Sequence, residues 1–349
     1  MCRCPSYWNR NTETHRSIVT HYNLLLLTDP LITQPIAAIE SLISVLSASP
    51  PSTTSETLSL LASYTATLKA SVLNPIPISA GTDLFQRYIL STLQTQETPD
   101  FIGKRKRISA SGGVQDSKAI RSHLLANSRL FVQRAKGARS RIAEVARRFV
   151  REGSTVITCG RSRVVAAVLN AAADVGIRFR AIYVEESYGP NHSSNSADVV
   201  KTLRRRDIPV ATIPFAALAT ALPSVTFALV GAESIVENGG AISGMGTHQI
   251  GLLMRSVGKP LYVAAESHKF VRVYPLNGED LPIGQGALEY RTEKDDDESD
   301  GKIEHEEGRR KGGNEGVDFT PPELITAIVT EAGVQTPGAV SEELIKIWY

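Results

Sequence analysis

A glycine-rich stretch in the second half of the chain holds the residue types best suited to bind an anion. Glycines recur from Gly231 to Gly240, and Gly244–Thr247 leads into a segment with helical periodicity. Glycine lets the backbone approach a ligand closely, and the free N–H groups of a helix start attract phosphate. Arg163 and Lys269 follow other predicted strands and could add charge-assisted hydrogen bonds. The stretch matches neither a Walker loop nor a GxGxxG motif, so it predicts either a phosphate site or a set of turns.

Cys159 is the candidate nucleophile, because it directly follows a predicted strand at Thr155–Thr158. Two interpretations stay open: a reactive thiol, or a small buried residue at a strand end, where free cysteine is frequent. No histidine lies near it in the sequence to activate it. Cys2 and Cys4 are too closely spaced for a usual zinc site, and an odd count of three indicates no disulfide framework. The sequence therefore predicts no metal and no cofactor.

The second half of the chain alternates short apolar segments with helical ones. This pattern is typical of a parallel sheet with helices on both faces, in which ligands bind beyond the carboxyl ends of the strands. The predicted strands are Thr155–Thr158, Phe179–Val184, Val210–Ile213, Thr226–Val230 and Leu261–Ala265. The predicted helices are Arg163–Val175, Asp198–Arg206, Phe215–Leu222, Thr247–Val257, Glu323–Ala332 and Ser341–Trp348.

The first half of the chain has helical periodicity almost throughout. Helices are predicted at Ser17–Leu27, Pro35–Ala48, Glu56–Leu73, Asp83–Leu93 and 117–152. The fold class is therefore α/β, with a helical N-terminal domain followed by a Rossmann-like parallel α/β domain. We expect a disordered tail at 1–15, the helical domain at 16–152, and the α/β domain at 153–349 with a disordered acidic insertion at 291–316.

Composition narrows the function classes. The 349 residues carry a net charge of +2 and 42% hydrophobic side chains, which argues against a dedicated nucleic-acid binder and for a sizeable core. No apolar run reaches the roughly 18 residues that a membrane helix needs, so we expect a soluble, intracellular chain. The basic run Lys104–Arg107 is either a solvated loop or a contact for an acidic partner.

Four long motifs resemble the alpha-subunit family of eukaryotic translation initiation factor 2B. They are ISAGTDLFQRYIL, GAESIVENGGAISGMGTHQIGLL, KPLYVAAESHKFVRVYPLNGEDLP and VDFTPPELITAIVTEAGVQTPGAVSEELIKIWY. The resemblance covers residues 30 to 349 apart from the acidic insertion. That family in turn resembles ribose 1,5-bisphosphate isomerases and methylthioribose 1-phosphate isomerases.

The resemblance implies a pocket that has lost its chemistry. In the isomerases, a Cys after the first strand and an Asp in a Gly-Ala-Asp motif transfer protons. Glu233 stands at the Asp position and Gly160 at the Cys position, so Cys159 is one residue out of place. A misplacement of ~1 Å can cost ~100-fold in rate, so we expect no catalytic residues. The implied pocket for a sugar phosphate or nucleotide monophosphate consists of Ser79, Ala80, Gly81, Thr158, Arg163, Glu186, Glu233, Asn238, Gly246, Thr247 and Lys269.

The resemblance also implies a role. We expect a cytoplasmic homodimer, formed by the α/β domains, that bridges the other subunits of a guanine nucleotide exchange complex for initiation factor 2. It would help to sense the phosphorylated alpha subunit of that factor through its helical domain. Arg129, Arg134 and Lys136 are candidates for that contact, or they form a solvated helix face. The alternatives are a sugar-phosphate aldose–ketose isomerase and a free-standing metabolite sensor.

Overall fold

The computed structural model describes residues 7–29, 31–48, 54–72, 74–95, 132–185, 196–281 and 317–348. The chain forms two compact units, residues 1–138 with 346–349 and residues 139–345. The division falls inside a helix over residues 132–146, earlier than the boundary at 152 expected from the sequence. Each unit has its own apolar core.

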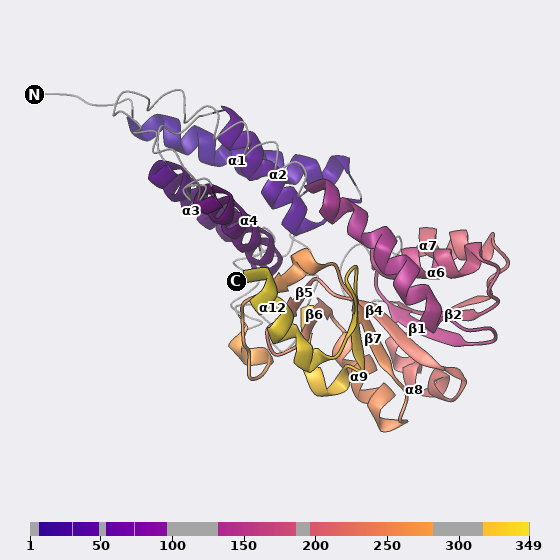
Figure 1. The fold of residues 1–349 in the computed structure, drawn as a ribbon. Coiled ribbons are helices and arrows are strands. Elements are labelled where there is room, and N and C mark those ends of the chain that lie inside the picture. The colour runs from indigo at the N-terminus through magenta and orange to yellow at the C-terminus, as the bar shows by residue number, and fades with distance from the viewer. Residues whose placement is uncertain are drawn as a thin grey trace, which may run out of the picture. The chain divides into compact units, whose positions relative to one another are not determined.

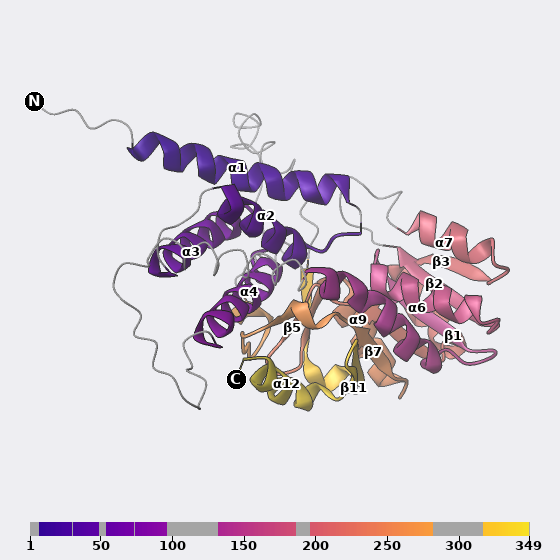
Figure 2. The same ribbon diagram turned by 45° about the horizontal axis from the view of Figure 1, so that its top comes forward.

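The first unit is helical, as predicted. Its α2 packs against α1 and α4, and α3 packs against α4 (Figures 1 and 2). Tyr22, Leu42 and Phe85 are among the fully buried side chains of its core. The four helices are α1 (Tyr7–Thr28), α2 (Gln34–Ala48), α3 (Thr54–Ala70) and α4 (Ile76–Thr95).

Two expectations for this unit are corrected. α1 begins at Tyr7, so residues 7–15, which we expected to be a disordered tail, are helical. Buried Ile18 and Tyr22 anchor that helix, and extending an existing helix adds one hydrogen bond per residue even for polar residues. α4 begins at Ile76 rather than at Asp83, and it therefore contains the expected pocket residues Ser79, Ala80 and Gly81.

The second unit is built on a seven-stranded sheet of order β11-β10-β7-β4-β1-β2-β3. Its strands are parallel except for β11 at one edge. Helices α6 and α7 lie on one face and α8 and α9 on the other (Figure 1), which confirms the predicted α/β class. The strands are β1 (Thr155–Cys159), β2 (Arg180–Glu185), β3 (Val210–Pro214), β4 (Phe227–Gly231), β7 (Leu261–Ala264), β10 (Ala327–Thr330) and β11 (Gly333–Gln335). The helices are α6 (Arg163–Asp174), α7 (Ala197–Arg204), α8 (Leu218–Ala221), α9 (Thr247–Ser256) and α12 (Val340–Trp348).

A second sheet of four strands, in the order β8-β5-β6-β9, follows the carboxyl end of β4. The sequence did not predict it, because we interpreted the glycine-rich stretch as a loop. Its strands are β5 (Ser234–Val236), β6 (Ala241–Gly244), β8 (Phe270–Val271) and β9 (Val317–Thr320). Short 3-10 helices complete the unit: η1 (Arg147–Phe149), η2 (Phe215–Ala217), η3 (Leu222–Ser224), η4 (Ser267–Lys269), η5 (Gly278–Asp280), η6 (Pro322–Leu324) and η7 (Pro337–Ala339).

Two predicted helices are wrong in this unit. Residues 323–332 form the end of η6 and then strand β10, because Ile328 and Val329 are buried beside β7 in the sheet. β-branched residues suit such a position. Phe215–Leu222 is only a one-turn α8 between two 3-10 turns. In the part of the chain that the structure describes, no helix is long and apolar enough to cross a membrane.

Candidate functional site

β1 and β4 end side by side at a switch point of the sheet. The chain leaves β1 toward β2 and leaves β4 toward β7, in opposite directions across the sheet. The two connections therefore separate onto opposite faces, and parallel α/β sheets bind ligands in a crevice at such a switch point. Thr158 and Cys159 end β1, and Gly231 ends β4. The switch point thus lies where the sequence placed the candidate site.

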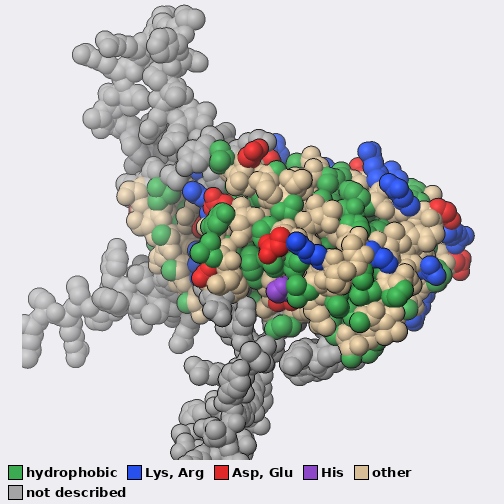
Figure 3. Space-filling model, turned by 90° about the horizontal axis from the view of Figure 1, so that it is seen from below, with side chains coloured by type: hydrophobic (Ala, Val, Ile, Leu, Met, Phe, Trp, Pro, Cys, Tyr) green, Lys and Arg blue, Asp and Glu red, His purple; other side chains and the backbone are tan. Residues whose placement is uncertain are grey.

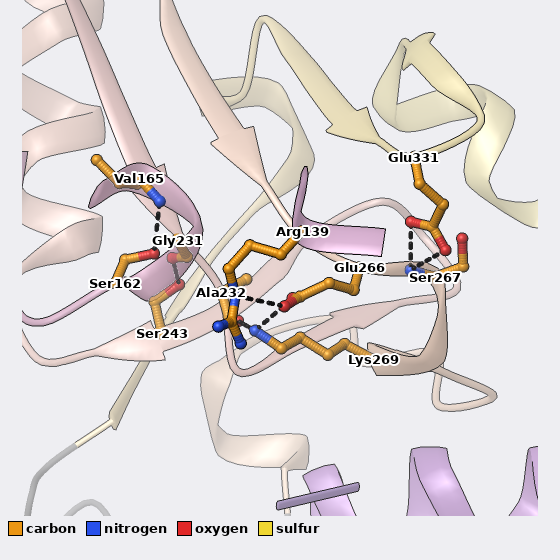
Figure 4. Close-up of polar contacts among 10 residues, drawn as sticks. All are labelled: Arg139, Ser162, Val165, Gly231, Ala232, Ser243, Glu266, Ser267, Lys269 and Glu331. Atoms are coloured by element: carbon orange, nitrogen blue, oxygen red, sulfur yellow. Dashed lines mark hydrogen bonds and ion pairs between the residues drawn. The ribbon is translucent and has the colours of Figure 1, made fainter. Parts of the chain in front are cut away.

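Ser162 and Gly231 hold the two strand ends together. Ser162 caps α6, and its Oγ accepts a hydrogen bond from the backbone N of Val165 at 3.3 Å (Figure 4). A Cβ at Gly231 would overlap this hydroxyl, so the close approach requires glycine. Ser243 Oγ donates to the Gly231 carbonyl at 3.0 Å and attaches β6 to the same point. Some of these glycines thus have a packing role.

The start of α9 lies against the end of β1. Cys159 Sγ is 3.5 Å from Thr247 Oγ1, which donates to the Gly244 carbonyl at 2.9 Å. Gly246 has φ +100°, a left-handed conformation that favours glycine. Because Cys159 is buried and its Sγ lies beside the Thr247 hydroxyl, its surroundings fit a packed cysteine better than a nucleophile.

The helix start at Thr247 is already occupied by a carboxylate. Asp318 Oδ2 accepts hydrogen bonds from the backbone N of Gly246 at 2.7 Å and of His248 at 3.0 Å. Burial raises the pKa of Asp318 to about 6, against the lowering effect of these N–H groups. A phosphate at the α9 start would compete with this side chain. No local sequence pattern indicated this contact, because Asp318 comes from β9, 70 residues after His248.

A buried ion cluster lies beyond the end of β7. Lys269 Nζ lies 2.8 Å from Glu266 Oε2 and donates to the Ala232 carbonyl at 2.8 Å, while Arg139 Nε is 3.8 Å from Glu266 Oε1 (Figure 4). Burial alone would raise the pKa of Glu266, which is 1% exposed, but Lys269 and His268 lower it to about 2. The predicted cation Lys269 is therefore neutralised by a carboxylate that the sequence did not single out.

His268 and Glu331 complete this end of the sheet. Burial lowers the pKa of His268 to about 4, so the imidazole is neutral at physiological pH. Glu331, just after β10, accepts hydrogen bonds from the Ser267 backbone N at 3.1 and 3.3 Å and fixes the turn that carries the ion cluster. The second unit thus brings together, at the ends of β1, β4 and β7, Thr158, Arg163, Glu233, Gly246, Thr247 and Lys269.

Asn238 and Glu186 are the other predicted site residues of the α/β unit. Asn238 shapes the β5–β6 turn: its Nδ2 donates to the Pro275 carbonyl at 2.7 Å, and its Oδ1 accepts from the Gly240 backbone N at 2.8 Å. Both polar groups of Asn238 are therefore used within the fold. Glu186 lies outside the described residues.

Ser79, Ala80 and Gly81 lie inside α4 of the helical unit. Ala80 is 1% exposed, and a Cβ at Gly81 would meet the backbone of Pro35 at 2.7 Å. Ser79 N and Oγ both donate to the Pro75 carbonyl, at 2.9 and 3.0 Å. Residues 79–81 thus belong to a helix that packs on Pro35 of α2, and their part in a ligand pocket stays a prediction. Nothing in the sequence around Gly81 indicated this packing.

The helical unit also holds the candidate contacts for a phosphorylated partner. Lys136 Nζ forms ion pairs with Glu40 at 2.7 Å and Asp29 at 4.0 Å. Arg134 is exposed, and Arg129 lies outside the described residues. Among the residues with a described placement, no group of three or more His, Cys, Asp and Glu side chains is arranged to hold a metal.

Comparisons with known proteins identify relatives along most of the chain. A family model described as "Initiation factor 2 subunit family" matches residues 28–337. Translation initiation factor eIF2B subunit alpha of Caenorhabditis elegans is 29% identical over 95% of this chain and 98% of its own length. The protein of the same name from Dictyostelium discoideum is 36% identical over 65% of this chain and 69% of its own length.

Enzymes and solved structures also match. Ribose 1,5-bisphosphate isomerase of Haloterrigena turkmenica is 31% identical over 63% of this chain and 66% of its own length. The crystal structure of eIF2B beta from Chaetomium thermophilum superimposes with a TM-score of 0.70 at 17% identity, over 99% of this chain and 97% of that one. A chain of the tetrameric eIF2B-beta2-delta2 complex from C. thermophilum superimposes with a TM-score of 0.70 at 19% identity, over 99% of this chain and all of that one. These structural similarities support the fold.

Proposed function

Because this chain belongs to the initiation factor 2 subunit family, we propose that it is a non-catalytic regulatory subunit of the eIF2B complex, which exchanges guanine nucleotides on translation initiation factor 2. The observation that carries the proposal is the match to an eIF2B alpha subunit over nearly the full length of both chains. A relative that aligns end to end shares both the helical unit and the α/β unit, not just a common domain. Such a subunit would act in the cytoplasm.

The subunit would assemble as a homodimer through its α/β unit and bridge two copies of the other subunits. The helical unit would contact the phosphorylated alpha subunit of initiation factor 2. Arg134 and Lys136 are both exposed and would supply the positive charge for the phosphate. Recognition of the phosphorylated partner would then lower exchange under stress.

The crevice between β1 and β4 would bind a sugar phosphate or a nucleotide monophosphate. Arg163 at the start of α6 and Lys269 beyond β7 would supply positive charge, and Thr158 and Glu233 would face the sugar. The α9 start could hold the phosphate only when the Asp318 carboxylate moves away or is protonated. Binding of the ligand would therefore be weak at a pH at which the Asp318 carboxylate is charged. Weak binding suits a modulator better than a substrate.

A second candidate function is an aldose–ketose isomerase, which the similarity to a ribose 1,5-bisphosphate isomerase favours. It would need Glu233 as the acid–base group and Cys159 as its partner. Cys159 Sγ instead lies at hydrogen-bonding distance from Thr247, and Gly160 stands at the position of the enzymes' cysteine. An isomerase site in which both the carboxylate and the thiol are displaced is expected to have lost most of its catalytic rate. We therefore prefer the role of a regulatory subunit to that of an isomerase.

Affinity purification of the tagged full-length chain at low salt tests the regulatory role. We expect the other eIF2B subunits to co-purify in equal molar amounts, with initiation factor 2 in a smaller amount. A chain that emerges alone would refute the bridging role. Turnover of ribose 1,5-bisphosphate, measured in parallel, should be absent. Turnover that disappears in Glu233→Gln, with Glu237→Gln as the control on the same hairpin, would establish the isomerase instead.

A further inference from the structure

A cluster of arginines lies at the edge of the seven-stranded sheet opposite the candidate site. Arg151 precedes β1, Arg178 and Arg180 lie at the start of β2, and Arg205 ends α7 ahead of β3. Because β1, β2 and β3 are parallel neighbours, their amino ends meet at one edge. All four side chains are exposed. On the face drawn in Figure 3, Lys and Arg side chains lie at the right of the molecule, with Asp and Glu side chains among them. We call these four residues the amino-edge patch.

The backbone beneath the amino-edge patch is fixed by hydrogen bonds between its loops. The backbone N of Gly153 donates to the Arg178 carbonyl at 2.7 Å, and that of Arg180 donates to the Ser154 carbonyl at 2.8 Å. These bonds join the loop before β1 to the loop before β2. The charges are thus presented from a rigid edge, which reduces the entropy lost when a partner binds.

Neighbouring arginines serve the fold, whereas those of the patch do not. Arg204 donates to the Val210 carbonyl at 2.9 Å, and Arg206 pairs with Asp174 at 3.1 Å. In contrast, no side chain of the amino-edge patch forms a hydrogen bond or an ion pair with any residue whose placement is described. Four unpaired like charges repel each other, so stability does not explain them.

The composition of this edge distinguishes between classes of partner. Protein interfaces are centred on buried aromatic or apolar anchors, but Val175 and Val257 are the large hydrophobic side chains exposed on the described loops of this edge, and neither is aromatic. Proteins that bind single strands stack bases on aromatic rings, and the described residues of these loops expose none. Guanidinium groups match phosphate oxygens with paired hydrogen bonds. The edge therefore suits the phosphate backbone of a duplex, in which the bases face inward.

We infer that the amino-edge patch binds the phosphate backbone of a nucleic-acid duplex without reading its sequence. A net charge of +2 over the whole chain is compatible with such binding, because the four arginines of the patch form a local excess of positive charge. This contact is distinct from the crevice and from the subunit role proposed above, and it does not depend on either.

Fluorescence anisotropy of a labelled RNA duplex of about 20 base pairs tests the inference on the full-length chain. Titrations between about 50 and 200 mM salt give the slope of the logarithm of affinity against the logarithm of salt concentration. Arg178→Gln/Arg205→Gln should make the slope shallower by about 2, one per lost phosphate contact. Arg161→Gln/Arg272→Gln removes the same charge from exposed positions elsewhere and should leave the slope nearly unchanged.

A gain-of-affinity variant separates binding from misfolding. Asp207 is exposed beside the patch and has φ 60°, a left-handed conformation that asparagine also tolerates. Asp207→Asn should therefore fold normally, remove a repulsive charge and tighten binding. The inference would be overturned if both double variants made the salt slope shallower by the same amount, or if binding did not depend on salt. Displacement of the RNA by a polyglutamate peptide would also overturn the inference. A DNA duplex of the same length, measured in parallel, shows which kind of duplex the patch prefers.

Discussion

Replacing Asp318 by asparagine tests the reasoning about the α9 start most directly. Burial raises the pKa of Asp318 from 3.8 to about 6, although hydrogen bonds from Gly246 and His248 act in the opposite direction. The folded chain thus binds more protons than the unfolded chain between about pH 4 and 6, so the wild type loses stability as the pH rises through that window. Asparagine retains an acceptor oxygen for the same N–H groups and has no proton to lose.

The magnitude follows from the shift in pKa. Moving from 3.8 to about 6 is roughly two units, or about 3 kcal/mol of folding free energy between pH 4 and 7. Because Asp318 is only partly buried, solvent screening reduces the expected value to about 2 kcal/mol. Asp318→Asn should therefore match the wild type near pH 4 and be more stable by about 2 kcal/mol near pH 7.

Urea denaturation followed by circular dichroism at a series of pH values measures this difference. Asp198→Asn, which changes an exposed carboxylate in the first turn of α7, is the matched control and should show no comparable pH dependence. If the advantage of Asp318→Asn stays constant or shrinks as the pH rises, the two N–H bonds outweigh burial. The carboxylate would then be a stabilising cap, and the argument from burial would be wrong.

Two further changes test the packing and the charges of the site. Gly246→Ala should cost about 2 kcal/mol or more, because the residue has φ +100° and its Cβ would overlap the Phe215 ring. Gly251→Ala, inside α9 and 3.3 Å from the nearest side-chain atoms, should change the urea midpoint far less, and an equal loss would contradict this. Lys269→Met should cost about 3 kcal/mol at neutral pH by leaving the Glu266 carboxylate buried beside only a distant arginine. Adding Glu266→Gln should restore most of that stability, and no recovery would mean that the ion pair is not what Lys269 contributes.

The Glu266 ion pair also sets an acid limit on stability. The pKa of Glu266 is lowered to about 2 in the folded chain, so its contribution is complete above the ordinary value of 4.5 and declines as the pH falls toward 2. The contribution of Asp318 has the opposite sign over an overlapping window. The dependence of the wild type's unfolding free energy on pH combines the two contributions. Asp318→Asn should leave the contribution of Glu266, and Glu266→Gln should leave that of Asp318.

The strands of the main sheet could be predicted from sequence because each is a short apolar run between helical segments. Val156–Cys159 and Phe227–Val230 are buried on both faces, which requires continuous apolar residues. The same rule failed for β10, where Ile325, Ile328 and Val329 fit both a helical and an extended period. Pairing with β7 decides that segment, and no local pattern encodes this pairing.

The second sheet could not be predicted for a different reason. Its strands have two to four residues each, too few for an alternating pattern, and glycines lie between them. Only the pairing of β5 with β6 and β8, and of β6 with β9, gives these residues a strand conformation. A glycine-rich stretch was therefore interpreted as a ligand loop, although several of its glycines are fixed by close packing.

The candidate site shows why residue types alone overestimate anion binding. The sequence identified the strand ends, the α9 start and the cation Lys269, and the structure brings them to one edge of the sheet. It also brings Asp318 to the α9 start and Glu266 to Lys269. Both partners are carboxylates, so the two positive features that predicted a phosphate site are already neutralised within the chain. A phosphate ligand must displace one of them, and the free energy of that exchange sets the affinity.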